Sequence, residues 1–180
     1  MSRLRRVVQS DCYFFVTCNV RKVLPRAEQS SRYANPVMLL EDPDFALLAD
    51  AIVACRKQLG FLLTAWVFMP DHWHAILCPR EPGGISDAMK LIKQRSTHAI
   101  GLARQQSLRL WQPRFHEHAL RTVREYMGAV EYIHLNPVRR NLVARPEDWK
   151  WSSIHDYSPG GTSPLPIDRV NLPLDPNARL

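Results

Sequence analysis

The apolar positions near the start of the chain first follow the spacing of a strand and then that of a helix. Residues 12–20, CYFFVTCNV, are rich in aromatic and β-branched side chains, which favours a strand. In residues 41–60 the apolar side chains recur at helical spacing, which predicts an amphipathic helix. Asp42 is suited to cap this helix, Pro43 to its first position and Gly60 to its end.

Segments with strand spacing and segments with helix spacing also follow one another along the rest of the chain. Residues 61–69 and 72–78 are two apolar runs separated only by a proline and an aspartate, which predicts a hairpin of well-buried strands. Three further elements are expected in the order helix, strand and helix: residues 86–106, 114–121 and 123–136.

Turn and cap residues set the expected limits of these elements. Residues 21–36 are polar and broken by proline, which favours a loop, and residues 81–84, EPGG, favour a turn. Ser86 or Asp87 is suited to cap the second helix. Pro137 is expected to end the third helix, since the residue before a proline disfavours the helical conformation.

The order βαββαβα predicts an α+β domain in which a small central antiparallel sheet has helices packed on one face. This domain is expected to span residues 1–157. Residues 158–180 contain five prolines, so the tail is expected to be extended or disordered and not a second domain.

The composition of the chain indicates which class of partner it binds and in which compartment it is expected. With 180 residues and 46% hydrophobic side chains, the chain is typical of one ordinary globular domain. Its formal net charge of +7 favours a polyanionic partner, most often nucleic acid. The four cysteines include no C-x-x-C pair, which favours reduced thiols in the cytoplasm. No apolar run is long enough to span a bilayer, and no membrane association is expected.

Two histidines, His72 and His74, stand one residue apart within an apolar run. Side chains at i and i+2 of a strand point to the same face, so the imidazoles point together while Trp73 points the other way. Burying two unpaired imidazoles costs free energy, and a shared metal ion would satisfy both. The pattern also allows two separately hydrogen-bonded histidines. A second pair with this spacing, His116 and His118, lies on another predicted strand.

Tyr132 and Asn136 are one turn apart on the third predicted helix, so they share one of its faces. Gly128 and Ala129 precede Tyr132 on that face, and their small side chains leave space for a ligand around the phenol. Two alternatives remain: a core tyrosine whose hydroxyl binds a backbone group, and an asparagine that only marks the helix end.

In combination, these features resemble the HUH single-strand endonucleases, and most closely the REP-associated tyrosine transposases. The matching stretches are YFFVTCNVRK, WVFMPDHWHAILCP, LWQPRFHEHALR, YIHLNPVRRNLV and DWKWSSIHDY, which cover roughly residues 11–157 in the family's order. The resemblance implies a ferredoxin-like, HUH-type sheet. It also implies cleavage and rejoining of single-stranded DNA through a covalent 5′-phosphotyrosine on Tyr132, next to a hairpin in repetitive, REP-like DNA.

The resemblance further implies a metal centre. His72 and His74 would be ligands, and Asn136 stands where the wider HUH transposases commonly have a glutamine. His118 lies in a W-x-x-R-F-x-x-H stretch that the family shares, which makes it a candidate neighbour of the site. Mg²⁺ or Mn²⁺ suits a site of imidazole nitrogens, an amide oxygen and phosphate oxygens. Zn²⁺ also suits two histidines but does not explain the tyrosine.

A basic segment lies between these motifs. From Ala88 to His116 the chain contains no Asp or Glu, which predicts a surface that binds the nucleic-acid backbone. The candidate DNA-binding residues are Lys90, Lys93, Arg95, Arg114, Arg139 and Arg140. Trp149 and Trp151 could stack on bases, but a structural lid over the core is favoured.

The expected protein is a monomeric enzyme of the cytoplasm, associated with the nucleoid, whose partner is single-stranded or hairpin DNA. Two other functions fit the same motifs. One is a non-catalytic nucleic-acid-binding domain of the same fold. The other is a metal-dependent phosphodiesterase that uses water as its nucleophile.

Overall fold

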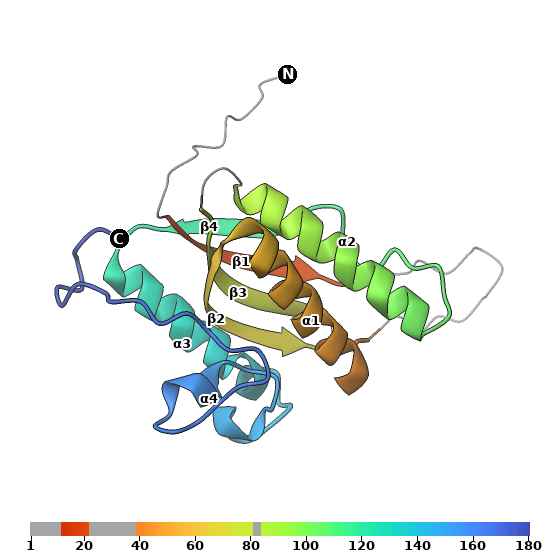
Figure 1. Ribbon diagram of the computed structural model, residues 1–180. Coiled ribbons are helices and arrows are strands. Elements are labelled where there is room, and N and C mark those ends of the chain that lie inside the picture. The colour runs from red at the N-terminus through yellow and green to blue at the C-terminus, as the bar shows by residue number, and fades with distance from the viewer. Residues whose placement is uncertain (1–11, 22–38, 81–83) are drawn as a thin grey trace, which may run out of the picture.

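Figure 1 shows the computed structural model, which describes residues 12–21, 39–80 and 84–180. The described residues form one antiparallel sheet of four strands in the order β2-β3-β1-β4. The strands are β1 (Tyr13–Asn19), β2 (Leu62–Met69), β3 (His72–Cys78) and β4 (His116–Leu120). The helices are α1 (Asp42–Leu59), α2 (Ile85–Ala103), α3 (Val123–Arg139) and the short α4 (Ile154–Tyr157), with a 3-10 turn η1 (Pro146–Asp148). The predicted α+β class with an antiparallel sheet is confirmed.

Two predicted segments lie almost entirely outside the described residues: the loop at residues 21–36 and the turn at residues 81–84. All four cysteines, including the three buried ones, are free thiols. Within the three described ranges, no helix combines the length and the apolar character that crossing a membrane requires.

Helices cover both faces of the sheet, so the expectation that they pack on one face is wrong. Helices α1 and α2 lie side by side over one face, where Trp73 and Leu77 of β3 are buried (Figure 1). Helix α3 packs on the opposite face against Val67 and Ile76. The cause lies in the sequence of the hairpin. Strands β2 and β3 are buried along nearly their whole length, and alternate residues of a strand point to opposite faces, so both faces require a cover.

The ends of α1 differ in how closely they follow the prediction. Gly60 ends the helix as predicted, in the left-handed conformation with φ 70°. The N-cap is Glu41 and not Asp42. Glu41 and Asp44 form a reciprocal capping box, in which the backbone N–H of Glu41 donates to the Asp44 carboxylate at 2.8 Å.

Helix α2 begins at Ile85, and no side chain caps it. The predicted caps Ser86 and Asp87 therefore lie inside its first turn. Glycine is acceptable at an N-cap, and Gly84 takes that position here.

Helix α3 continues through Pro137 to Arg139, although the sequence predicts that it stops at Asn136. The proline removes one helical hydrogen bond because it lacks an N–H. The remaining turn is still closed, since Arg140 N donates to Asn136 O at 3.1 Å and Leu142 N donates to Pro137 O at 3.0 Å. The extra turn carries Arg139 close to the candidate site.

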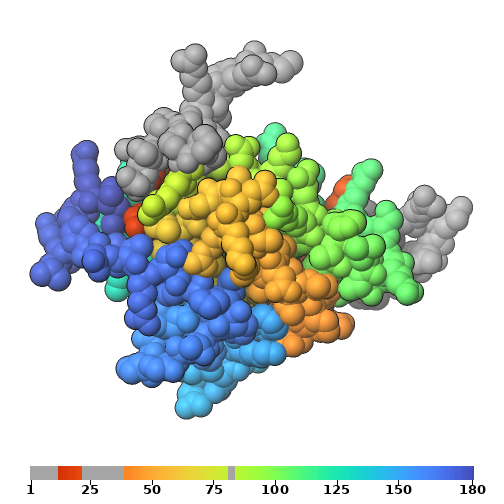
Figure 2. All heavy atoms as spheres, viewed as in Figure 1, coloured from red at the N-terminus to blue at the C-terminus, as the bar shows by residue number. Residues whose placement is uncertain are grey.

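The tail, residues 158–180, is extended and packed against the domain. Leu165 is fully buried, and its carbonyl accepts a hydrogen bond from Trp66 Nε1 at 2.7 Å. Asp168 forms an ion pair with Arg56 of α1 at 2.6 Å. Figure 2 shows the blue surface of the tail in contact with the orange surface of α1. Of the two states that its prolines predict, the tail therefore takes the extended one.

Trp149 and Trp151 form the predicted lid. The indole of Trp151 packs against Phe45 and Phe68 of the core, and its N–H donates to Asp42 at 2.5 Å. The N–H of Trp149 donates to the carbonyl of Phe68 at 2.9 Å. Both indoles therefore use their polar atoms within the protein.

Candidate active site

The two histidines of β3 lie side by side on the sheet face that α3 covers. The centroids of the His72 and His74 rings are 4.6 Å apart, and both side chains are buried. Trp73, between them in sequence, belongs to the core under α1 and α2. The orientation predicted from the strand period is therefore confirmed. The neighbouring strand β1 places Thr17 opposite His74.

Each of the two imidazoles has a partner at its Nδ1 atom. His72 Nδ1 donates to the carboxylate of Asp71 at 2.5 Å, and His74 Nδ1 lies 2.8 Å from the hydroxyl oxygen of Thr17. Partners at Nδ1 leave the Nε2 atoms for another role, and Nε2 of His74 is buried with no hydrogen-bond partner among the described residues. A carboxylate that holds Nδ1 in this way is the usual support of a metal-binding histidine.

The electrostatics keep His74 uncharged. Burial, with a smaller contribution from the neighbouring His72, lowers the pKa of His74 to about 3, so its imidazole is neutral at physiological pH. Neutral imidazole is the form that binds metal ions. The hydrogen bond from His72 lowers the pKa of Asp71 below its ordinary value, which keeps that carboxylate ionised. The site thus combines a buried nitrogen lone pair with a nearby negative charge.

Tyr132 of α3 contacts His74 on the sheet face that α3 covers. Its ring centroid lies 5.3 Å from that of His74 and 5.7 Å from that of Phe15, edge-on to both. The residue is 40% exposed, and within the described ranges its hydroxyl has no hydrogen-bond partner. The alternative of a hydroxyl bonded to the backbone therefore does not describe Tyr132; it describes Tyr157, whose hydroxyl donates to Thr64 O at 2.8 Å.

Asn136 is buried one turn beyond Tyr132, and its Oδ1 has no hydrogen-bond partner in the described part of the chain. A buried amide oxygen without a partner is costly, as is the unpaired Nε2 of His74. Each is an atom of the kind that a bound cation would satisfy. No three His, Cys, Asp or Glu side chains gather into a metal-binding cluster among the described residues. His72, His74 and Asn136 are therefore the candidate ligands that these elements offer to a cation.

The second histidine pair lies on the same face at the edge of the sheet. Strand β4 pairs with β1 so that His116 lies opposite Thr17 and His118 lies opposite Phe15. Both histidines are exposed. His118 and Tyr132 line a common hollow of about 260 Å³. His118 therefore borders the space around the tyrosine.

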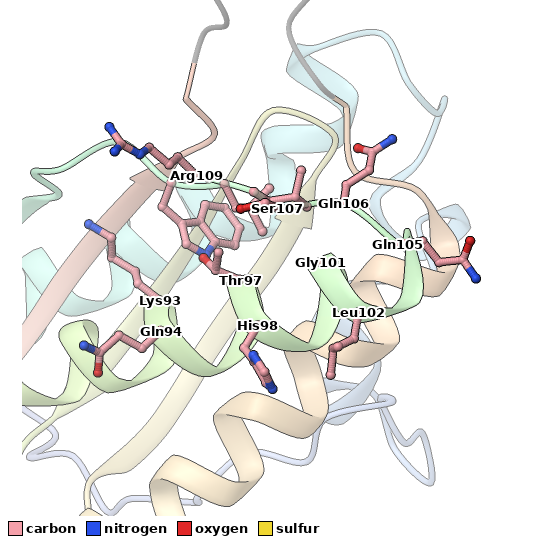
Figure 3. Close-up of a pocket in the computed structure, with 13 residues that line it drawn as sticks. Lys93, Gln94, Thr97, His98, Gly101, Leu102, Gln105, Gln106, Ser107 and Arg109 are labelled. Atoms are coloured by element: carbon pink, nitrogen blue, oxygen red, sulfur yellow. The ribbon is translucent and has the colours of Figure 1, made fainter.

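The acid-free segment forms a groove on the far side of the sheet, along α2. One hollow of about 840 Å³ lies between α2 and the segment that follows it, and Figure 3 shows Lys93 and Arg109 projecting at the same end of it. An adjoining hollow of about 650 Å³ is lined by Lys90, Lys93 and Arg114. The two hollows share Lys93 and together extend the groove toward the edge strand β4.

The basic residues of this groove differ in how they are engaged. Lys93 donates to two backbone carbonyls of the segment after α2, at 2.6 and 2.9 Å. Arg95 donates to Gln58 of α1 at 2.6 Å. Lys90 and Arg114 are exposed and have no partner among the described side chains. The last two are therefore the cations most available to a ligand.

Two further arginines lie at the end of α3. The guanidinium carbon of Arg139 is 5.2 Å from the centre of the Tyr132 ring. The charge of Arg140 contributes to the lowered pKa values of both Asp71 and His74, which places positive potential at the histidine pair.

Comparison with known proteins gives the class that this fold and site define. Residues 32–136 match the model of a family described as IS200-like transposases. The chain is 32% identical to the REP-associated tyrosine transposase of Escherichia coli (strain K12) over 166 residues, which are 92% of this chain and 90% of that protein. It is also similar to a solved structure described as a REP-associated tyrosine transposase bound to a REP hairpin. The TM-score is 0.68 and the identity 30%, with 100% of this chain and 99% of the other covered.

The chain therefore belongs to the IS200-like transposases, and within them to the REP-associated tyrosine transposases. The resemblance seen in the sequence and the predicted transposase class are confirmed.

Sequence reasoning missed the residues that hold the histidines. Asp71 directly precedes His72, and an acidic residue beside a candidate ligand could have been recognised as its partner. Thr17 had no such signal, because its place beside His74 depends on the pairing of β1 with β3. The contact of Arg139 with Tyr132 was also missed, since it requires α3 to continue past Pro137.

Proposed function

We propose that this chain is a metal-dependent endonuclease and strand transferase of single-stranded DNA that acts beside a hairpin in REP-like repetitive DNA through a 5′-phosphotyrosine on Tyr132. The observation that carries the proposal is the contact between the partly exposed Tyr132 ring and the buried His74, 5.3 Å apart. The hairpin substrate is supported by the similar solved structure that is described as bound to a REP hairpin.

The covalent step is an exchange of one phosphodiester for another. The phenol oxygen of Tyr132 attacks phosphorus and forms a P–O bond, while the bond from phosphorus to the 3′ oxygen breaks. The phenolic proton leaves to the surrounding groups, and the departing oxygen takes up a proton to become a 3′ hydroxyl. Attack by a 3′ hydroxyl on the phosphotyrosine reverses these bond changes and rejoins a strand without ATP.

Arg139 and Arg140 supply positive charge where the phosphate would lie. The Arg139 guanidinium lies close to the Tyr132 ring, so it can offset charge that develops on the phosphate oxygens. The Tyr132 ring lies between this guanidinium and the His74 ring, so its position relative to both is defined by packing.

His72, His74 and Asn136 are the residues that fit a divalent cation, because they offer two imidazoles and a buried amide oxygen without a partner. Mg²⁺ or Mn²⁺ suits this set, and Mn²⁺ is the better match for nitrogen ligands. Such an ion supplies polarisation of the scissile phosphate when bound. Asp71 and Thr17 fix the two rings through their Nδ1 atoms.

Six basic residues are proposed to contact the DNA backbone: Lys90, Lys93, Arg95, Arg114, Arg139 and Arg140. The groove along α2 would hold the part of the substrate that extends past the edge strand β4. Lys90 and Arg114 are expected to contribute most within it, since Lys93 and Arg95 already form hydrogen bonds inside the protein.

One chain is proposed to be sufficient for the reaction. Tyr132 contacts His74 of its own chain, so no second copy is required to bring nucleophile and histidines together. We therefore expect a monomer, acting in the cytoplasm on the nucleoid. Residues 1–157 are proposed as the catalytic domain and residues 158–180 as its tail.

A denaturing gel tests the proposed function. The protein is incubated with Mn²⁺ and a labelled REP-like hairpin that carries single-stranded flanks. A band of protein joined to DNA is expected for the parent and for the control Tyr126→Phe, but not for Tyr132→Phe. Cleavage without an adduct would instead identify a phosphodiesterase that uses water, and binding without cleavage would identify a non-catalytic module.

A further inference from the structure

A hollow beside Tyr132 takes no part in the phosphotyrosine step described above. It measures about 260 Å³ and lies between the edge of the sheet and the N-terminal half of α3. Four of its lining residues are apolar or aromatic and two are polar: Phe15, Leu120, Ala129 and Tyr132, then His118 and Glu125. A site that opens directly at the nucleophile is placed to hold a neighbouring part of the substrate.

The size and walls of the hollow suit one flat ring system. Pockets for drug-sized ligands have volumes of about 300–1,000 Å³, so this hollow is smaller. The rings of Phe15 and Tyr132 stand at 80° to each other and give the space two aromatic sides. Ala129 contributes only a methyl group to the lining. The space is therefore kept open.

Glu125 gives the hollow a hydrogen-bond acceptor. Its Oε2 accepts from the backbone N–H of Arg121 at 2.7 Å, and the hydroxyl of the N-cap residue Thr122 accepts from the Glu125 N–H at 3.2 Å, so both residues hold the start of α3. An ionised carboxylate has further acceptor capacity. A negative charge close to a DNA phosphate is unfavourable unless the substrate donates to it. Cytosine N4 and adenine N6 are amino groups of that kind.

We propose that this hollow binds the unpaired nucleobase next to the scissile phosphate, and that Glu125 selects a base with an exocyclic amino group. The proposal rests on the proposed function, because it requires DNA to be attacked by Tyr132. A base held between Phe15, His118 and Tyr132 fixes the adjoining phosphorus in front of the phenol oxygen.

The base pocket is tested by combining a change in the protein with a change in the substrate and comparing the cleavage rates. The variant Ala129→Leu fills the hollow, and leucine is a good helix former, so α3 should persist. Ala54→Leu, at an exposed position of α1, is the matched control. Each protein is assayed on the intact substrate and on two substrates that lack the base on one or the other side of the cleaved bond.

Filling the hollow and removing the base that occupies it should each slow cleavage. Because both changes remove the same contact, making them together should slow cleavage no more than either change alone. Ala129→Leu should cleave the intact substrate about 10- to 100-fold more slowly than the parent, the range expected for a lost stacked base. On one of the two abasic substrates, parent and variant should cleave at equal rates. The proposed base pocket would be contradicted if Ala129→Leu cleaved the intact substrate as fast as the parent does. It would also be contradicted if Ala129→Leu cleaved both abasic substrates more slowly than the parent by the same factor as on the intact substrate. If the parent forms no adduct on any substrate, the proposed function fails first and this proposal fails with it.

Glu125→Gln tests the selection of the base. The amide oxygen of glutamine can still accept from the backbone N–H of Arg121, so the thermal stability should remain close to that of the parent. The parent should cleave substrates with cytosine at this position about 10-fold faster than those with thymine, and the variant should lose that preference because an amide also donates to thymine O4. Glu131→Gln, an exposed change on the same helix, should keep it. Equal rates for the parent on both substrates, or a preference that survives in Glu125→Gln, would contradict the role of Glu125.

Discussion

Two histidine pairs with identical spacing lie on the same face of one sheet, and they differ in almost every property that matters for binding a metal ion. His72 and His74 occupy β3, which has a neighbouring strand on each side, and both are buried. His116 and His118 occupy the edge strand β4 and are exposed. The first pair has side-chain partners at Nδ1, whereas the second has none among the described residues.

This difference shows that the position of a strand in the sheet decides what an H-x-H motif can do. A central strand fixes two rings by packing and leaves a buried nitrogen without a partner, which favours a bound ion. An edge strand leaves the rings exposed to solvent, and this suits contact with a substrate that arrives and departs. The spacing alone is the same in both pairs.

The largest expected effect separates the two pairs directly. His72→Ala or His74→Ala should reduce Mn²⁺-dependent cleavage by more than about 100-fold, since loss of a ligand should exceed the loss caused by a supporting residue. Hairpin binding should persist, because phosphate contacts supply most of the affinity. Single-turnover cleavage and a gel-shift assay measure the two quantities.

The control for this comparison is His116→Ala, which should retain cleavage within about 10-fold of the parent, since solvated surface substitutions seldom cost more. Parent-like cleavage by both β3 variants, together with loss in His116→Ala or His118→Ala, would reverse the assignment of the two pairs.

A smaller effect is expected from the support of the central pair. Asp71→Asn keeps an acceptor for His72 Nδ1 but removes the charge, so the affinity for Mn²⁺ should fall by about 10- to 100-fold. Calorimetric titration of the protein with Mn²⁺ in the absence of DNA measures this affinity. Asp50→Asn, on the exposed side of α1, should have no effect. An unchanged affinity for Mn²⁺ in Asp71→Asn would show that the carboxylate only positions the protein turn between β2 and β3.

The smallest expected effect concerns the basic groove that leads to the edge strand. Replacing Lys90 and Arg114 with glutamine should weaken binding to all single-stranded sequences alike. It should also reduce the slope of log affinity against log salt by about 0.7 for each lost contact. Arg95→Gln should change the slope less, since this guanidinium already donates to Gln58. A slope that stays constant in the double variant would mean that the groove is solvated and not a path for DNA.

Much of the site was within reach of the sequence because it depends on local periodicity. The strand period placed His72 and His74 together, and the helix period placed Asn136 on the face of Tyr132. The buried hairpin was predictable for the same reason. The apolar character of its strands at nearly every position also indicated two covered faces, a signal that the prediction of helices on one face did not use.

What could not be predicted depends on contacts between elements distant in sequence. Thr17 is 57 residues from His74, and only the order of strands in the sheet brings them together. Lys93 and Arg95 look alike in the sequence as free cations, but tertiary packing engages both. Pro137 remained helical because the turn after it is closed by hydrogen bonds from beyond the predicted end.

Mass spectrometry of a trapped adduct tests the central claim most directly. Protein incubated with Mn²⁺ and a hairpin substrate is digested with protease and nuclease, and the modified peptide is sequenced. The account predicts a nucleotide attached to Tyr132, and no adduct or cleavage in Tyr132→Phe, which removes one oxygen and little packing. A nucleotide on any other tyrosine, or cleavage that persists in Tyr132→Phe, would contradict it.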